Sequence, residues 1–231
     1  MKYIITSKIL PKMCEEHLRA LGFSFIFLPP WERLQAGVSS HPDMLLFIYG
    51  KKFVTSCEYF EIAKEPLSSL ISLGYEPILT DEIPSADYPH DILFNALPLG
   101  DNIIGLERGI SKKLSQLGAK IVNVRQGYAK CSALKVSETA IITADRGIAS
   151  AAKSCGADVL LISEGHINID GYDHGFIGGA GGSDEHAVYF CGDLSSHPDG
   201  KSIEKFCKKH EKECISLGNE PLFDVGTLFF I

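Results

Sequence analysis

Short apolar runs and amphipathic segments alternate along the whole chain in one recurring order. An apolar run precedes an amphipathic segment with hydrophobic residues every three or four positions, and a glycine and a second apolar run follow. The glycines are Gly22, Gly74, Gly118 and Gly156, which lie 52, 44 and 38 residues apart. A fifth segment, IEKFCKKHEKECISL, has the same pattern without a glycine. Such a period of roughly 40–50 residues is typical of solenoids, propellers and arrays.

The pattern predicts five helices, each followed by a strand. The helices are expected at about residues 11–20, in LSSLISLG, in ERGISKKLSQLG, in RGIASAAKSCG and in DGKSIEKFCKKHEK. Each glycine suits a left-handed helix C-cap, because glycine adopts positive φ without a steric penalty. The runs IVNV and VLLI that follow two of these helices are typical of strands buried on both faces.

The apolar run before most helices is double, which predicts a hairpin. MLLFIYGKKFVTS, ILFNALPLGDNIIG and SALKVSETAIIT each have two apolar halves around a short turn, the last at Ser137–Glu138. Each unit therefore runs strand, turn, strand, helix, strand. The N-terminal KYIITSK supplies only the second half of a hairpin, and the C-terminal LFDVGTLFFI only the first. We expect an α/β fold of five pseudo-symmetric units, a β/α-propeller closed by pairing of the N- and C-terminal strands.

Composition and charge narrow the class of protein. The chain has 231 residues, of which 45% are hydrophobic and 22% charged, as in globular proteins with a full core. Its net charge of −7 disfavours nucleic-acid binding. The first apolar run is too short for a secretory signal, and no run approaches the roughly 20 residues of a membrane helix. We expect one domain over residues 1–231, a cytoplasmic location, and no nucleic-acid or membrane partner.

Polar residues interrupt apolar surroundings where the first strand of each unit begins. In a ring these positions converge on the central axis and face one shared cavity. The candidates, in chain order, are His41 and Asp43; Asn95; Gln126, Tyr128, Lys130 and Cys131; Asp170, Tyr172, Asp173 and His174; and Asp224. Their acidic balance favours a small cationic or amino-acid-like ligand.

Structural roles explain several of these residues equally well. Asp43 follows a proline and suits a turn. Asn95 suits a hydrogen bond to a neighbouring loop backbone. Asp224 suits acceptance of hydrogen bonds from the amides of the following turn. These alternatives remain open from the sequence.

Cys131 has a structural and a functional interpretation. The seven cysteines are irregularly spaced and include no CxxC pair, which indicates free thiols, most of them small core residues. Lys130 next to Cys131 favours a lowered thiol pKa and a nucleophilic role. Adjacent residues of a strand face opposite sides, however, which would separate the two side chains.

The stretch INIDGYDHGFIGGAGGS is rich in glycine and in polar side chains. It lacks the Lys-Ser/Thr of a phosphate-binding loop, and glycines also permit close backbone approach at a crowded centre. His41, Asp43, Asp173 and His174 are metal-ligand types, but no known ligand spacing connects them. We therefore predict no metal and no cofactor.

Five such units closed by the chain ends resemble the pentein superfamily of five-bladed β/α-propellers. It includes arginine and agmatine deiminases, dimethylarginine hydrolases, amidinotransferases and a non-catalytic ribosome anti-association factor. The motifs NVRQGYAKCSA and GYDHGFIGGAGG also resemble an uncharacterised family of bacterial hypothetical proteins.

In the deiminase-like members a cysteine attacks a guanidinium carbon, a histidine moves protons, and carboxylates grip the planar N–H fork. The resemblance implies Cys131 as nucleophile, His41 or His174 as acid/base, and Asp43, Asp170 or Asp173 as the carboxylate that binds the guanidinium. The family's nucleophile lies in the closing strand, where this chain has Asp224.

Two functional hypotheses follow. The first is a protein that binds a small cationic or amino-acid-like ligand in an acidic axial pocket without catalysis. The alternative is a Cys131-dependent hydrolase or transferase acting on a guanidino or amide substrate. A Cys131 sulfur more than about 6 Å from any imidazole or carboxylate would exclude the second hypothesis on geometry.

Overall fold

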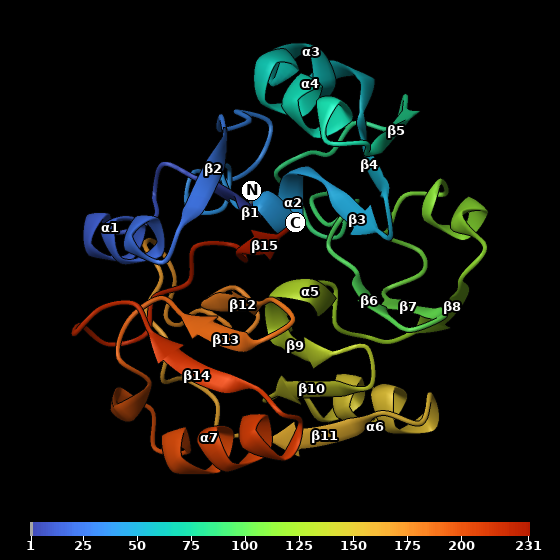
Figure 1. Cartoon of the computed structure of the whole chain (residues 1–231). Helices are drawn as coiled ribbons and strands as arrows, with labels where there is room; N and C mark the ends of the chain where they lie inside the picture. Colours follow the sequence, from blue (N-terminus) through green and yellow to red (C-terminus); the bar gives the residue numbers. More distant parts are fainter. Residues whose placement is uncertain (1) are drawn as a thin grey trace.

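Five separate three-stranded sheets form the fold, and the computed structural model describes residues 2–231 (Figure 1). In each sheet the middle strand pairs antiparallel with one neighbour and parallel with the other. The sheets, each written with its middle strand second, are β15 (Phe229–Phe230), β1 (Lys2–Ser7) and β2 (Phe23–Leu28); β3 (Phe47–Tyr49), β4 (Lys52–Ser56) and β5 (Glu76–Thr80); β6 (Leu97–Leu99), β7 (Asn102–Gly105) and β8 (Lys120–Asn123); β9 (Ala133–Ser137), β10 (Ala140–Thr143) and β11 (Asp158–Leu161); and β12 (Gly181–Ser183), β13 (Ala187–Phe190) and β14 (Glu213–Ser216).

Helical segments connect the two parallel strands of each sheet. They are α1 (Lys12–Ala20), α3 (Cys57–Ile62) with α4 (Lys64–Ser72), η1 (Leu114–Leu117), α6 (Arg146–Ser154), and η2 (Leu194–Ser196) with α7 (Gly200–Lys209). Two short helices, α2 (Pro42–Leu45) and α5 (Ala129–Ser132), instead precede β3 and β9. Figure 1 shows α1, α4, α6 and α7 at the periphery, with α2, α5 and β15 near the centre.

The predicted glycine caps are confirmed. Gly22, Gly74, Gly118 and Gly156 have φ between +83° and +89° and lie one or two residues after the last residue of their helical segments. In the fifth unit Glu211 takes this position with a φ of +59°. The same backbone turn is therefore made there by a residue that has a Cβ atom.

The helix predicted in ERGISKKLSQLG is wrong over most of its length, because only Leu114–Leu117 forms a 3₁₀ helix. The Glu82 carboxylate accepts hydrogen bonds from the Ser111 hydroxyl and from the Lys112 N–H. Asn123 Oδ1 accepts a bond from the Glu107 N–H at 3.0 Å. These side chains accept hydrogen bonds from backbone N–H and hydroxyl groups in the first half of the segment, which folds as irregular turns and not as a helix.

The two chain ends meet in one sheet. β1 pairs antiparallel with β15, with Ile4 opposite Phe230 and Ile5 opposite Phe229. The sheets over residues 2–231 form no single continuous closed sheet and surround the centre as separate units (Figure 1). The predicted hairpins are present, but the turn expected at Ser137–Glu138 lies at Glu138–Thr139, because Ser137 still pairs with Ala140.

Apolar clusters join neighbouring sheets. The largest includes Ile5 of β1, Val54 of β4 and Ile103 of β7, all fully buried. Burial of such side chains is the main force that holds separate sheets together and fixes the central segments between them. Among residues 2–231, every helix falls short of the length and apolarity needed to cross a bilayer.

Candidate active site

Five segments meet at the centre, each directly before the first strand of a sheet. Backbone hydrogen bonds connect them: the Asp43 N–H donates to the Gly226 carbonyl at 3.2 Å, and the Gly179 N–H to the Cys131 carbonyl at 3.1 Å. The central side chains that they contribute are Asp43 from α2, Asn95 from the turn before β6, Cys131 from α5, and Asp224 and Thr227 from the segment before β15.

Asn95 fixes the position of Cys131. Its carbonyl oxygen accepts bonds from the N–H groups of Lys130 at 2.9 Å and Cys131 at 3.3 Å. Its amide nitrogen donates to Cys131 Sγ at 3.0 Å. Asn95 therefore bonds a neighbouring backbone, as one alternative expected, and also anchors the thiol.

Cys131 lies beside a carboxylate and an imidazole. Its thiol donates to Asp43 Oδ2 at 3.1 Å. One donor atom from each of His41, Asp43 and Cys131 lies within 4.8 Å of the other two, and all three residues are buried. Both ring nitrogens of His41 and Oδ1 of Asp43 have no hydrogen-bond partner within residues 2–231. The Cys131 sulfur therefore lies within the limit of about 6 Å from an imidazole and a carboxylate, so the geometry does not exclude nucleophilic chemistry.

This trio is also a set of metal-ligand types. It joins His41 and Asp43 with Cys131, whereas the ligand types considered from the sequence, without a supporting spacing, were His41, Asp43, Asp173 and His174. His41 Nδ1 lies 3.7 Å from Asp224 Oδ1, so a second carboxylate adjoins the cluster.

The Asp224 carboxylate binds the backbone of its own turn and also lies among the central residues. Its oxygens accept bonds from the N–H groups of Phe176 at 2.8 Å and Gly226 at 2.9 Å. A Cβ on Gly179 would lie 1.9 Å from Asp224 Oδ1, and one on Gly178 would lie 2.3 Å from the Lys130 carbonyl. The glycines in this segment thus permit close approach of chain segments at the crowded centre.

Thr227 is a central residue that no sequence pattern singled out. Its hydroxyl lies 2.7 Å from Asp43 Oδ2 and 2.9 Å from the Gly178 carbonyl, and accepts a bond from Lys130 Nζ at 3.0 Å. Its φ of +77° is rare for a β-branched residue and costs about 1–3 kcal/mol, which the surrounding bonds offset.

A cavity of about 250 Å³, the axial pocket, opens beside this cluster. Its polar lining consists of His41, Cys131, Asp173, His174 and Asp224, and its apolar and aromatic lining of Val38, Met44, Tyr128, Ile169, Tyr172 and Phe176. Seven residues singled out in the sequence therefore border one cavity, while Asp43 and Asn95 contact Cys131 beside it.

Three other candidates lie outside the axial pocket. Gln126 donates to Asp145 Oδ2 at 3.4 Å and caps the Tyr128 N–H. The side chain of Asp170 is exposed. Lys130 borders a different cavity from its neighbour Cys131, since adjacent residues of the short helix α5 project in different directions.

Burial dominates the electrostatics of the cluster. It raises the pKa of the Asp43 and Asp224 carboxyls, and nearby His41 opposes the rise in both. Burial, followed by the charges of Asp43 and Asp224, raises the pKa of the Cys131 thiol well above its usual range. The lowered thiol pKa expected from Lys130 is thus wrong, because burial and two acidic neighbours outweigh it.

The fold is similar to that of solved enzymes of the pentein superfamily. A dimethylarginine dimethylaminohydrolase from Pseudomonas aeruginosa superposes with a TM-score of 0.56 at 11% identity, over 93% of this chain and 91% of that one. An amidinotransferase from Microseira wollei in saxitoxin biosynthesis gives a TM-score of 0.55 at 13% identity, over 90% of this chain and 74% of that one. A C. jejuni agmatine deiminase gives 0.52 at 11% identity, over 94% and 87%.

Within this fold the chain belongs to a family of unknown function, DUF6873, which matches residues 4–229. No curated protein matches the sequence. The structural neighbours share the fold at low identity, so the chemistry of this chain has to be argued from its own residues.

Proposed function

We propose that the axial pocket binds a small organic cation that carries a guanidino or amino group. The observation that carries this proposal is a pair of buried carboxyls, of which Asp224 lines the cavity and Asp43 contacts Cys131 beside it. The charged form of a buried carboxyl is costly, so a ligand cation here gains the attraction that solvent no longer supplies.

The walls of the pocket fit the same class of ligand. Tyr128 and Phe176 stack with ring centroids 6.3 Å apart, and both border the cavity. Aromatic faces attract planar cations, by about 0.5–2 kcal/mol for each favourable contact. The names of the structural neighbours point in the same direction, because dimethylarginine and agmatine are both guanidino compounds.

The test is calorimetric titration of the whole chain with agmatine and L-arginine, and with citrulline, which keeps the α-amino and α-carboxyl groups of arginine but has a neutral ureido group in place of the guanidinium. We expect the cations to bind and citrulline to bind at least about tenfold more weakly, because a charged hydrogen bond contributes roughly 1.5–3 kcal/mol. Asp224→Asn should weaken cation binding by a similar factor, and the exposed Asp170→Asn is the matched control. Equal affinity for citrulline, or an equal loss in both variants, would contradict the proposal.

A second candidate function is covalent chemistry at Cys131, favoured by the cluster of His41, Asp43 and Cys131. The sulfur would form a bond to the amidino carbon, and the amine would leave with a proton delivered by His41. Water would then displace the sulfur, which regains its proton, to yield a ureido product. Burial and the charges of Asp43 and Asp224 raise the pKa of the Cys131 thiol, and a bound cation offsets those two charges.

Release of ammonia or amine from the same compounds tests this chemistry. Cys131→Ser should abolish release while cation binding stays within a few-fold of the wild type. Alkylation of Cys131 by iodoacetamide across pH 6–10 should show a high thiol pKa that falls when a non-reactive cation is bound. Binding without product release would support the binding function and reject the catalytic one.

A further inference from the structure

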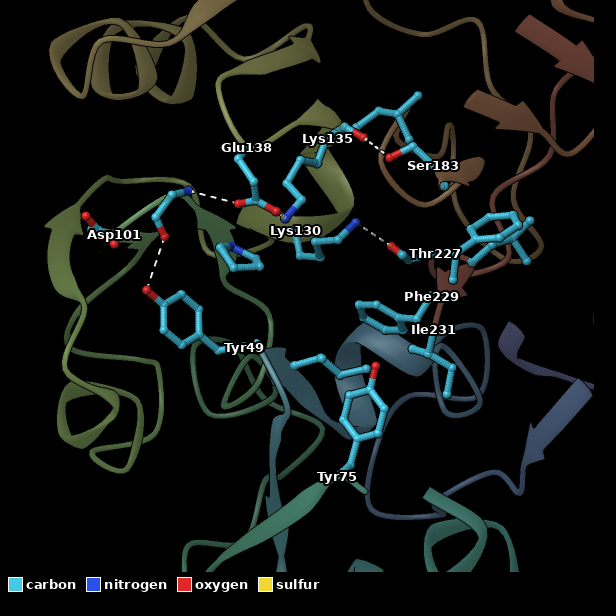
Figure 2. A pocket seen from close by; sticks show the side chains of 18 residues that line it. Tyr49, Tyr75, Asp101, Lys130, Lys135, Glu138, Ser183, Thr227, Phe229 and Ile231 are labelled. Atoms are coloured by element: carbon cyan, nitrogen blue, oxygen red, sulfur yellow. Dashed lines mark hydrogen bonds and ion pairs between the residues drawn. The ribbon is translucent and has the colours of Figure 1, made fainter. Parts of the chain in front are cut away.

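A second cavity, of about 600 Å³, shares no lining residue with the axial pocket (Figure 2). We call it the hairpin cavity, because it is bordered by the hairpin turns at Gly50, Gly100 and Glu138 and by residues 227–231. Figure 2 shows that its walls come from several sheets and that the Lys130 side chain reaches Thr227 inside it.

Lys130 brings a buried cation to this cavity. The residue is 7% exposed, and its ammonium donates one hydrogen bond, to the Thr227 hydroxyl. No carboxylate of residues 2–231 forms a direct ion pair with it. Asp43 binds the same Thr227 hydroxyl from the other side, and the charges of Asp43 and Asp224 act on the ammonium without touching it. An ammonium has three protons, so its hydrogen-bonding capacity is largely unused.

The other charges at the cavity are already paired or lie at its rim. Lys135 Nζ lies 2.6 Å from Glu138 Oε1, and Glu138 also accepts a bond from the Gly100 N–H. Asp101 is exposed. Lys130 is therefore the buried charge in this cavity that has no direct ion pair within residues 2–231, and a carboxylate in contact with a buried ammonium stabilises it strongly.

The remaining wall is apolar and aromatic. The Phe229 ring centroid lies 5.7 Å from Lys130 Nζ, and Ile48, Tyr75, Leu228 and Ile231 also border the cavity. The Ser183 hydroxyl donates to the Lys135 carbonyl and the Tyr49 hydroxyl to the Gly100 carbonyl. Few donors are thus free for a multiply charged anion such as phosphate, while apolar surface is plentiful.

We propose that the hairpin cavity binds a small monocarboxylate with a flat apolar body, its carboxylate paired with Lys130 and its body against Phe229 and Ile48. The proposal does not rest on the function assigned to the axial pocket, because the two cavities share no lining residue, although Thr227 connects Lys130 to Asp43.

Binding of a carboxylate at this site should be coupled to the protonation of Lys130. Burial lowers the pKa of the Lys130 ammonium, opposed by the charges of Asp43, Cys131 and Asp224 and reinforced by Lys135. A carboxylate bound beside Lys130 favours the charged ammonium and raises its pKa again. Binding should therefore be accompanied by proton uptake where the empty site is partly deprotonated, and affinity should fall as pH rises through that range.

The experiment is calorimetric titration of the whole chain with benzoate, benzyl alcohol and inorganic phosphate in two buffers of different ionisation enthalpy. We expect benzoate to bind and the other two to bind at least about tenfold more weakly. Lys130→Met should weaken benzoate binding about tenfold or more, whereas Lys135→Met, in the same cavity but already paired with Glu138, should change it less than threefold.

Ile48→Trp provides a test that leaves Lys130 in place. It fills part of the cavity and should abolish benzoate binding even if Lys130→Met fails to fold. Equal binding of benzoate and benzyl alcohol, phosphate binding as strong as that of benzoate, or full binding by Ile48→Trp would each overturn the proposal. Agmatine binding to Ile48→Trp should equal that of the wild type, which separates this site from the axial pocket.

Discussion

Glu211 occupies the position that a glycine fills after four other helical segments, and replacing it with glycine should stabilise the protein. The Glu211 N–H donates to the Lys208 carbonyl and the Lys212 N–H to the Cys207 carbonyl, which is the Schellman pattern of hydrogen bonds. Tyr75 and Ala157 make the equivalent bonds after Gly74 and Gly156. The turn is therefore the same, and only the residue in the left-handed conformation differs.

The magnitude follows from the backbone. A residue with a Cβ pays about 1–2 kcal/mol in the left-handed region, while glycine loses about 0.5–1 kcal/mol more conformational freedom on folding. We expect Glu211→Gly to raise the free energy of unfolding by about 1 kcal/mol. For a chain of this length that is a rise in Tm of about 2–4 °C.

Differential scanning calorimetry with two controls isolates the cause. Glu211→Ala keeps the strained φ and should change Tm by less than about 1 °C. Gly156→Ala should lower Tm by about 2–4 °C through φ alone, because a Cβ there would have no atom within 4 Å. The reasoning is refuted if Glu211→Gly leaves Tm unchanged, or if Glu211→Ala raises it equally.

Three further outcomes are expected at the centre. Burial raises the pKa of Asp43 in the folded state above its unfolded value, so its contribution to stability falls as pH rises through the interval between the two values. In urea unfolding, the free energy of unfolding of Asp43→Asn should therefore rise relative to that of the wild type from pH 4 to pH 8. A difference that stays constant with pH would contradict this. Thr227→Val removes the hydroxyl between Lys130 and Asp43 and should cost about 1–3 kcal/mol in the same assay, whereas Thr227→Ser should cost less. Tyr128→Phe removes the 2.5 Å bond to Asp91, whose other oxygen already lacks a partner among residues 2–231, and should lower stability by about 1–3 kcal/mol; no change would show that the bond contributes nothing.

Local patterns predicted the strands, most helices and the glycine caps, because each depends on neighbouring residues. The helix expected in ERGISKKLSQLG failed because Glu82, about 30 residues away along the chain, binds Ser111 and Lys112. Such a contact leaves no trace in the periodicity of the segment itself.

The sequence indicated where the candidate site lies, but not all of its residues or their contacts. Polar interruptions pointed to the axial residues His41, Cys131 and Asp224, which the structure brings to one pocket. Lys130 could not be assigned to another cavity without the geometry of α5. Thr227 gave no signal, since one threonine after a glycine is ordinary and its role comes from contacts made across the molecule.

The most direct test of the central claim is a crystal structure of the chain soaked with agmatine. The account predicts electron density in the axial pocket, with a cationic group of the ligand within hydrogen-bond distance of Asp224 and near Cys131. An axial pocket that stays empty at saturating agmatine, or a ligand with its cationic group away from the buried carboxyls, would contradict it.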